Sequence, residues 1–356
     1  MKIKSLTSFA LETINKIGWK KVILLGMIKL AMTIILFSCT KNDVAQPAID
    51  NTTGTNTGGF AESTEIITLN NPTGGNPLKA VLFIPASDKP VPAVVVMHGS
   101  GGLWSATDAT NTKLATQFKG WIDSFRIHKI AALFIDSYTP RGVQTFHNEA
   151  PPENLFIAAE FVRPRDAYAG LNYLRTVPKI IAGKIGLLGY SHGGTTVLST
   201  MVDAVAVAKS TPWSLISNNI TYTQNVLPPA QKPAAGGFVA AVSYYPGAAM
   251  FSYYGKPGTP SNGKYVPYAP VMIHAAALDP LYTTTYTNSD NNTQISSYDA
   301  LILKAQLNPA SAPITKYEYD GASHSFDGVT TASADGDASR LARARSIAFL
   351  ETFLFK

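Results

Sequence analysis

Nearly continuous apolar runs recur along the chain between residues 64 and 319. Runs of this kind, rich in aliphatic residues and without polar alternation, are typical of strands that are covered on both faces. The β-type runs that we assign to strands, several of which are nearly continuous in this way, are 64–69, 79–84, 93–97, 130–135, 184–189, 237–245, 269–276 and 314–319. The pattern therefore predicts a central sheet that is buried on both sides.

Helical patterns separate the later runs but not the first ones. Apolar residues at helical spacing mark residues 152–177, the segment after Ser191 and residues 338–355. This order predicts an α/β domain with a mostly parallel sheet, helices on both faces and an antiparallel N-terminal start. Residues 209–236 and 247–268, rich in Pro, Gly, Asn, Thr and Tyr, interrupt the alternation. We expect these long loops to be functional and to set the choice of substrate.

The first 38 residues follow a different pattern. They contain six lysines and a single acidic residue, and residues 22–37 form an apolar run that only Lys29 interrupts. The run is short for a transmembrane helix, which needs about 20 apolar residues. A basic segment followed by an apolar one is typical of an export signal. We therefore expect residues 1–38 to be a signal peptide, with an uncleaved anchor helix as the alternative.

Cys39, the only cysteine of the chain, follows this run directly. The sequence Leu-Phe-Ser-Cys at residues 36–39 resembles the bacterial lipoprotein box, in which the cysteine is lipidated and becomes the first mature residue. The resemblance implies an exported protein that a lipid on Cys39 anchors to a bacterial membrane, on its periplasmic or cell-surface face. Residues 39–62 are then a flexible tether and residues 63–356 the folded domain. A single cysteine excludes an intramolecular disulfide.

The charge distribution argues against a nucleic-acid partner. Of the net charge of +6, the first 38 residues carry +5 (six lysines less one glutamate), which leaves +1 for the rest of the chain. Binding to phosphate backbones needs a concentrated basic field. His98, His128 and His147 lack the spacing of metal ligands, and the chain has neither a G-x-x-x-x-G-K nor a G-x-G-x-x-G pattern. We expect no nucleic acid, no metal and no cofactor.

The sequence Gly189-Tyr190-Ser191-His192-Gly193 lies between a predicted strand and a predicted helix. In this context G-x-S-x-G indicates a nucleophile elbow, a sharp turn that exposes the serine hydroxyl at the edge of the sheet. Glycines two positions away on each side avoid collisions in such a turn. The helix that follows places its positive end beneath the hydroxyl. We predict that Ser191 is a nucleophile.

A serine nucleophile needs a general base and a carboxylate that orients the base. Of the two histidines well downstream, His274 lies within a predicted strand, as a core residue would, whereas His324 lies in a loop after the last strand. Asp279 follows the strand at 269–276 and precedes His324, which gives the chain order Ser, Asp, His. We predict His324 as the base and Asp279 as the acid, over the competing Asp290, Asp320 and Asp327.

A glycine-rich loop, residues 98–102, follows the predicted strand at 93–97. Acyl transfer needs preorganised donors for the negative charge that develops on the carbonyl oxygen. Small residues in such a loop allow the backbone to approach that oxygen. We predict that the backbone amides of Ser100 and His192 form the oxyanion hole.

Together these motifs resemble the dienelactone hydrolase-like branch of the α/β-hydrolase superfamily over residues 63–356. Beyond the three side chains, the resemblance rests on residues 134–142, 163–175, 244–247 and 319–326. It implies an α/β-hydrolase fold and hydrolysis of a small-molecule carboxylic ester through an acyl-enzyme. Dienelactone hydrolases proper use a cysteine nucleophile, so the lactone substrate is not implied for Ser191. The alternatives are a serine peptidase on the same fold and a non-catalytic, surface-tethered binding lipoprotein.

Other residues at strand ends are candidates for the substrate pocket. Those for which we predict substrate contact, with ordinary packing as the alternative, are Trp104, Tyr138, Arg141, Tyr190 and Tyr282. For Arg141, stabilisation of a loop together with Asp136 is a further alternative. Arg163 and Asp166, three residues apart on a predicted helix, are expected to form a structural ion pair or a helix cap.

Overall fold

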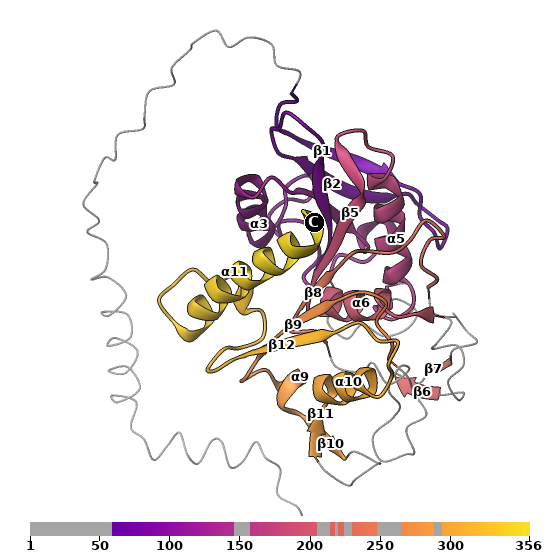
Figure 1. Ribbon diagram of the computed structural model, residues 1–356, viewed down its shortest axis with the longest axis vertical. Coiled ribbons are helices and arrows are strands. Elements are labelled where there is room, and N and C mark those ends of the chain that lie inside the picture. The colour runs from indigo at the N-terminus through magenta and orange to yellow at the C-terminus, as the bar shows by residue number, and fades with distance from the viewer. Residues whose placement is uncertain are drawn as a thin grey trace, which may run out of the picture. The chain divides into compact units, whose positions relative to one another are not determined.

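The computed structural model describes residues 59–145, 157–204, 214–217, 220–223, 230–247, 265–287 and 294–356. An eight-stranded sheet forms the centre of the domain (Figure 1). Its strands are β1 (Ser63–Leu69), β2 (Leu78–Ile84), β3 (Val91–Met97), β4 (Ala131–Asp136), β5 (Ile180–Tyr190), β8 (Ala241–Tyr244), β9 (Val271–Ala276) and β12 (Ile314–Tyr319).

The strand order in this sheet is β1-β2-β4-β3-β5-β8-β9-β12. Strand β2 runs antiparallel to β1 and β4, and every other neighbouring pair is parallel. The predicted α/β architecture with an antiparallel start is confirmed. Because the strands from β4 to β12 are parallel, the loops after β3, β5, β8, β9 and β12 all leave the sheet at its carboxyl edge, where open α/β sheets bind ligands.

Each central strand buries side chains on both faces, which explains the unbroken apolar runs. In β3, Ala93 and Val95 pack on the face that carries the helices α5 (Arg163–Leu174), α6 (His192–Thr200) and α10 (Ser297–Gln306). Val94 and Val96 pack on the opposite face, against α3 (Thr116–Ile127) and α11 (Ala334–Leu354). Figure 1 shows α3 and α11 together on one side of the sheet and α5 and α6 on the other.

The structure adds elements that we did not assign from the sequence. Helix α3 buries Phe118, Trp121 and Phe125, and α10 buries Tyr298 and Leu301. Within the segments that we treated as irregular loops lie the short hairpin strands β6 (Ser214–Ser217) and β7 (Ile220–Thr223). A second hairpin pairs β10 (Thr285–Thr287) with β11 (Gln294–Ser296).

Two predicted boundaries differ from the structure. Strand β5 begins at Ile180 rather than at residue 184, and α5 begins at Arg163, after a turn at residues 157–162, rather than at residue 152. Pro164 in the first turn of α5 explains its start, because proline is compatible with a helix only where its missing N–H has no partner to lose.

The predicted signal peptide, Cys39 and most of the predicted tether lie outside the described residues. Phe60 pairs with Ser87 in an isolated bridge, and β1 begins at Ser63. Within the described ranges, no helix is both long enough and apolar enough to cross a membrane.

Candidate active site at the carboxyl edge of the sheet

Ser191 occupies the turn between β5 and α6 with φ 50° and ψ −115°. Positive φ is rare for a residue with a side chain, and strained residues of this kind cluster at functional sites. A Cβ on Gly189 would lie 2.3 Å from the carbonyl oxygen of Gly193, and a Cβ on Gly193 would lie 2.2 Å from that of Met97. Only glycine fits at both positions, so the G-x-S-x-G pattern is a requirement of the backbone.

The turn is fixed by hydrogen bonds to the neighbouring strand. The Ser191 amide donates to the carbonyl oxygen of Tyr244 at 2.9 Å, and the Gly247 amide donates to that of Ser191 at 3.2 Å. A Cβ on Gly194 would lie 2.7 Å from the Tyr244 oxygen, so the first turn of α6 also packs directly on the end of β8. The sheet therefore holds the Ser191 backbone in its strained conformation.

Side chains from three loops meet at this turn. The Ser191 hydroxyl lies 2.8 Å from Nε2 of His324, which lies in the loop after β12. Nδ1 of His324 lies 2.6 Å from Oδ2 of Asp279, at the end of the loop after β9. When the carboxylate accepts from Nδ1–H, Nε2 of the neutral ring is left to accept the serine proton.

The environments of Asp279 and His324 differ. Asp279 is fully buried, and its second oxygen accepts the Leu281 amide at 2.9 Å, as the N-cap of the short helix α9 (Pro280–Thr283). The His324 side chain is 29% exposed. The carboxylate is thus shielded from solvent, whereas the imidazole that it contacts can be reached from outside.

The competing residues lie elsewhere. His274 is buried in β9, where its Nδ1 lies 2.8 Å from the Tyr319 hydroxyl and its Nε2 2.8 Å from the Ser346 hydroxyl. Burial lowers the pKa of His274 to about 3, as expected for a neutral core residue. Asp320 is exposed, and Asp290 lies outside the described residues. Asp327 is buried three residues after His324, and its carboxyl group accepts from the Tyr245 hydroxyl and from Gln117.

The loop after β3 runs along the elbow. A Cβ on Gly99 would lie 3.2 Å from the carbonyl oxygen of Tyr190 and 3.4 Å from Cβ of Ser191. Ser100 follows Gly99 directly, and His192 is the first residue of α6. The two backbone segments that we predicted to form the oxyanion hole therefore flank Ser191, while the role of their amides stays a prediction.

A buried polar layer that we did not predict lies behind the elbow. The Arg163 guanidinium is fully buried and donates from Nη1 to Nδ1 of His192 at 3.0 Å and from Nη2 to the carbonyl oxygen of His98 at 2.6 Å. The Tyr138 hydroxyl also lies 2.6 Å from Nδ1 of His192. Desolvation, together with the Arg163 charge, lowers the pKa of His98 and His192 well below the ordinary value. Both imidazoles are therefore neutral, and Nδ1 of His192 acts as an acceptor.

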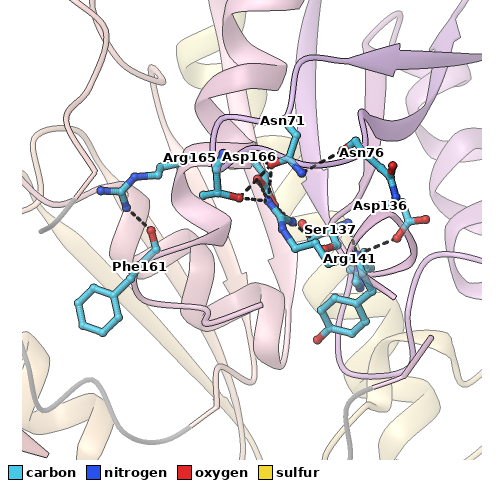
Figure 2. Close-up of polar contacts among 11 residues, drawn as sticks. Asn71, Asn76, Asp136, Ser137, Arg141, Phe161, Arg165 and Asp166 are labelled. Atoms are coloured by element: carbon cyan, nitrogen blue, oxygen red, sulfur yellow. Dashed lines mark hydrogen bonds and ion pairs between the residues drawn. The ribbon is translucent and has the colours of Figure 1, made fainter. Parts of the chain in front are cut away.

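Arg141 lies in a closed network with Asp166 (Figure 2). Its Nη1 and Nη2 each lie 2.7 Å from a different oxygen of Asp166, and the two side chains are only 6% and 0% exposed. Nη1 also donates to the carbonyl oxygen of Ser137 and Nη2 to Oδ1 of Asn71. The expected pair of Arg163 with Asp166 is wrong, because Asp166 bonds to Arg141 while Arg163 turns toward the elbow.

Four aromatic residues that we predicted to contact substrate are largely buried. Trp104 donates from Nε1 to Asp136 at 2.6 Å, and Tyr190 packs against Trp121 and Tyr244 in the core. The exposed fractions of these aromatic residues are 6% for Trp104, 0% for Tyr138, 1% for Tyr190 and 7% for Tyr282. Packing accounts for their positions, and substrate contact stays a prediction.

Asp136 stabilises the loop after β4. Its Oδ1 accepts the amides of Tyr138 at 2.9 Å and Thr139 at 3.0 Å, at the start of the short 3₁₀ helix η1 (Thr139–Arg141).

Across the parts of the chain that the structure describes, no three His, Cys, Asp or Glu side chains gather as metal ligands would.

Comparison with known proteins supports the fold assignment. Neither a protein-family model nor a curated protein matches the sequence. Among solved structures, a protein from Klebsiella pneumoniae subsp. pneumoniae assigned as a dienelactone hydrolase is 15% identical, with a TM-score of 0.52 over 83% of this chain and 100% of that one. The likeness, together with the strand order, defines an α/β-hydrolase fold.

Two further solved structures are similar at a lower score. A dienelactone hydrolase-like promiscuous phosphotriesterase from metagenomic libraries is 15% identical, with a TM-score of 0.49 over 83% of this chain and 99% of that one. An esterase from Pyrobaculum calidifontis is 14% identical, with a TM-score of 0.48 over 83% of this chain and 87% of that one.

Proposed function

We propose that the protein is a serine hydrolase that cleaves small carboxylic esters. The observation that carries the proposal is the hydrogen-bonded series from the Ser191 hydroxyl through His324 to Asp279. The three residues lie far apart in the sequence, and Ser191 has a strained backbone conformation of the kind that clusters at functional sites. The likeness in fold to a protein assigned as a dienelactone hydrolase supports the same reaction class.

The reaction follows from the proton positions. Nε2 of His324 takes the proton of the Ser191 hydroxyl as its oxygen forms a bond to the ester carbonyl carbon. The same nitrogen then gives that proton to the alcohol oxygen as the carbon–oxygen bond breaks, which leaves an acyl-enzyme. Water, activated in the same way, releases the acid and restores Ser191. The Asp279 carboxylate keeps the proton on Nδ1 and stabilises the imidazolium that forms in each step.

The negative carbonyl oxygen of each tetrahedral intermediate needs donors beside Ser191. We assign this role to the backbone amides of His192 and Ser100, which flank the serine. Loss of one such donor costs about 10²- to 10³-fold in rate. Helix α6 adds the partial positive charge of its N-terminus at the same point.

Ester hydrolysis by Ser191 is tested with short p-nitrophenyl esters and, in parallel, aminoacyl p-nitroanilides. The Ser191→Ala variant is expected to lose about 10⁶-fold in kcat. The matched control is Ser87→Ala, since Ser87 lies in the exposed loop between β2 and β3 and its hydroxyl bonds to the backbone of Lys89, donating to the carbonyl oxygen and accepting from the amide. A Ser191→Ala enzyme that keeps most of its activity would contradict the proposal. Faster cleavage of the anilides than of the esters would make the protein a peptidase instead.

The lipid anchor is a separate proposal that depends on the sequence alone. A basic segment, an apolar run and Cys39 follow one another in the order of a bacterial lipoprotein signal. We therefore propose that the mature protein begins at a lipidated Cys39 and is exported. Mass analysis of protein from its native host should find an N-terminal diacylglyceryl-modified cysteine, and an unmodified Cys39 in the mature chain would refute the anchor.

A further inference from the structure

Tyr245, the residue directly after β8, packs against the imidazole of His324. The two ring centroids are 4.9 Å apart and the ring planes meet at 62°, an edge-to-face arrangement. Tyr245 is buried, and its φ is 30°, a positive value that is unusual for a bulky side chain. Its amide donates to the carbonyl oxygen of His274 at 2.7 Å, which holds this backbone in place. A residue with a strained backbone therefore lies at the point where its ring contacts the imidazole.

Asp327 binds the hydroxyl of Tyr245, at the end of the tyrosine side chain. The hydroxyl donates to Oδ1 of the carboxyl group, and Oδ2 accepts from Nε2 of Gln117 on α3 at 2.7 Å. The backbone oxygen of Asp327 accepts from the Ser339 hydroxyl at 2.7 Å and from Nη2 of Arg343 at 3.3 Å, both on α11. Asp327 is 2% exposed, and helices on one face of the sheet therefore fix it from two directions.

One tyrosine thus contacts both ends of a short turn. Asp327 follows His324 by three residues, and Ser325 between them has φ 67°. The ring of Tyr245 touches the first residue of the turn and its hydroxyl binds the last. Asp279 restrains the imidazole at a single atom, Nδ1. An edge-to-face contact with the Tyr245 ring opposes the remaining freedom, which is rotation of the imidazole plane about that hydrogen bond.

We propose that Tyr245, anchored by Asp327, is a positioning residue that sets the plane of the His324 imidazole so that Nε2 faces Ser191. The inference rests on the proposed function and deepens it. Productive geometry tolerates errors of only about 10–20° in such groups. A carboxylate at one nitrogen and an edge-to-face contact with an aromatic ring together define both the position and the plane of the imidazole.

The protonation state of Asp327 provides a pH-dependent readout that a purely structural role of Tyr245 would not give. Burial raises the pKa of this carboxyl to about 7, and the contact with Gln117 and the charge of Arg343 oppose the rise. The groups that face it are Gln117 and Trp121 from α3, Arg343 from α11 and the hydroxyl of Tyr245. The charge of an ionised Asp327 in turn contributes to the raised pKa of the buried Tyr190 and Tyr244, which are neutral. Protonation of Asp327 in the neutral range removes the ionised acceptor of the Tyr245 hydroxyl.

The first experiment compares two variants that each lose one buried tyrosine hydroxyl. Tyr245→Phe removes the bond to Asp327 and keeps the ring. Tyr265→Phe is the matched control, because Tyr265 is fully buried and donates to the carbonyl oxygen of Leu198 at 2.9 Å, away from His324. With a short p-nitrophenyl ester, Tyr245→Phe is expected to lose between about tenfold and about 10²-fold in kcat with little change in KM, as for a small misplacement of a catalytic group. Tyr265→Phe is expected to keep kcat.

The second experiment is the pH profile of kcat in folded wild type, Tyr245→Phe and Asp327→Asn. Below about pH 7 the wild-type kcat is expected to fall more steeply than one protonation allows, and both variants are expected to lose the extra step. A Tyr245→Phe enzyme with wild-type kcat and profile would overturn the inference, as would an equal loss in Tyr265→Phe. If Ser191→Ala is inactive and Tyr245→Phe is not impaired, only the positioning role fails. If Ser191→Ala stays active, the proposed function itself fails.

Discussion

Two buried carboxylates near the same edge of the sheet are used in opposite ways. Asp166 gives both of its oxygens to Arg141, whose side chain is 6% exposed and whose remaining contacts are also internal. Asp279 gives one oxygen to a backbone amide and the other to His324, whose side chain is 29% exposed and whose far nitrogen meets the Ser191 hydroxyl. The first set of hydrogen bonds ends inside the protein, and the second ends at a group that a solute can reach.

The difference separates a stabilising network from a reactive one. The Arg141 network ties the loop after β4 to Asn71 beyond β1 and to α5, and leaves no donor of its terminal nitrogens directed at a substrate. The Asp279 series instead ends at the Ser191 hydroxyl through an imidazole that is 29% exposed. Loss of Asp279 should therefore change chemistry with little effect on folding, whereas loss of Arg141 should do the reverse.

Between the two carboxylates, the larger expected effect belongs to Asp279→Asn. The asparagine amide would donate to Nδ1 and force the proton onto Nε2, so that His324 could no longer accept the serine proton. We expect kcat for a p-nitrophenyl ester to fall by about 10⁴-fold, with a melting temperature close to that of the wild type. A loss below about tenfold at full expression of the folded protein would mean that Asp279 does not serve the base.

Arg141→Met tests the other side of the comparison. It leaves the Asp166 carboxylate buried without its partner, so the free energy of unfolding is expected to fall by about 3–5 kcal/mol. Urea denaturation measures this change, and kcat/KM of the folded fraction is expected to stay within about twofold, because the buried Arg141 network does not contact the reacting atoms. The double variant Arg141→Met, Asp166→Leu should recover part of the lost stability. Unchanged stability with a raised KM would instead assign Arg141 to substrate binding.

Burial of the Asp327 carboxyl group, without a cation bonded to it, is expected to make the stability of the protein depend on pH. The pKa of Asp327 is raised from the ordinary 3.8 to about 7, so the folded state binds a proton more tightly than the unfolded state does. Stability contributed by this proton is present below about pH 4 and is lost as the pH rises through about 7, by about 4 kcal/mol in all. Compared with Asp327→Asn, the wild type should therefore lose stability between pH 4 and pH 7 in urea titrations. Parallel pH curves for the two proteins would show that Asp327 is charged throughout.

His274 is expected to have the corresponding effect on the acid side. Burial lowers its pKa from 6.5 to about 3, so below about pH 6.5 the unfolded state binds a proton that the folded state does not. Stability from this residue is present above pH 6.5 and is lost as the pH falls, by about 1.4 kcal/mol for each unit. The His274→Gln variant, measured between pH 6 and pH 4, should show a shallower loss by one proton. An unchanged pH dependence of stability in His274→Gln would mean that a different group takes up this proton on unfolding.

The sequence predicts the elbow and the central strands well because both are local backbone requirements. Contacts at Gly189 and Gly193 exclude any side chain, and strands such as β3 alternate their apolar residues between two covered faces. Helix α3 could have been predicted in the same way, since Phe118, Trp121 and Phe125 have the spacing of one helical face.

Side-chain partners across the fold could not be predicted in this way. Arg163 and Asp166 lie on the same helix, and only the positions of the elbow and of the loop after β4 decide that one turns to His98 and the other to Arg141. The contact of Tyr245 with His324 and Asp327 depends on how β8, α3 and the last loop meet. The spacing of residues along the chain does not predict such a contact.

Reaction with a fluorophosphonate probe, followed by peptide mapping, tests the central claim most directly, because only an activated serine displaces the fluoride to form a bond to phosphorus. We expect the wild-type protein to carry one phosphonate, on Ser191. The His324→Ala and Asp279→Asn variants should react far more slowly. An unlabelled wild-type protein, or a label on a different serine, would contradict the assignment of Ser191, His324 and Asp279 to one hydrolytic site.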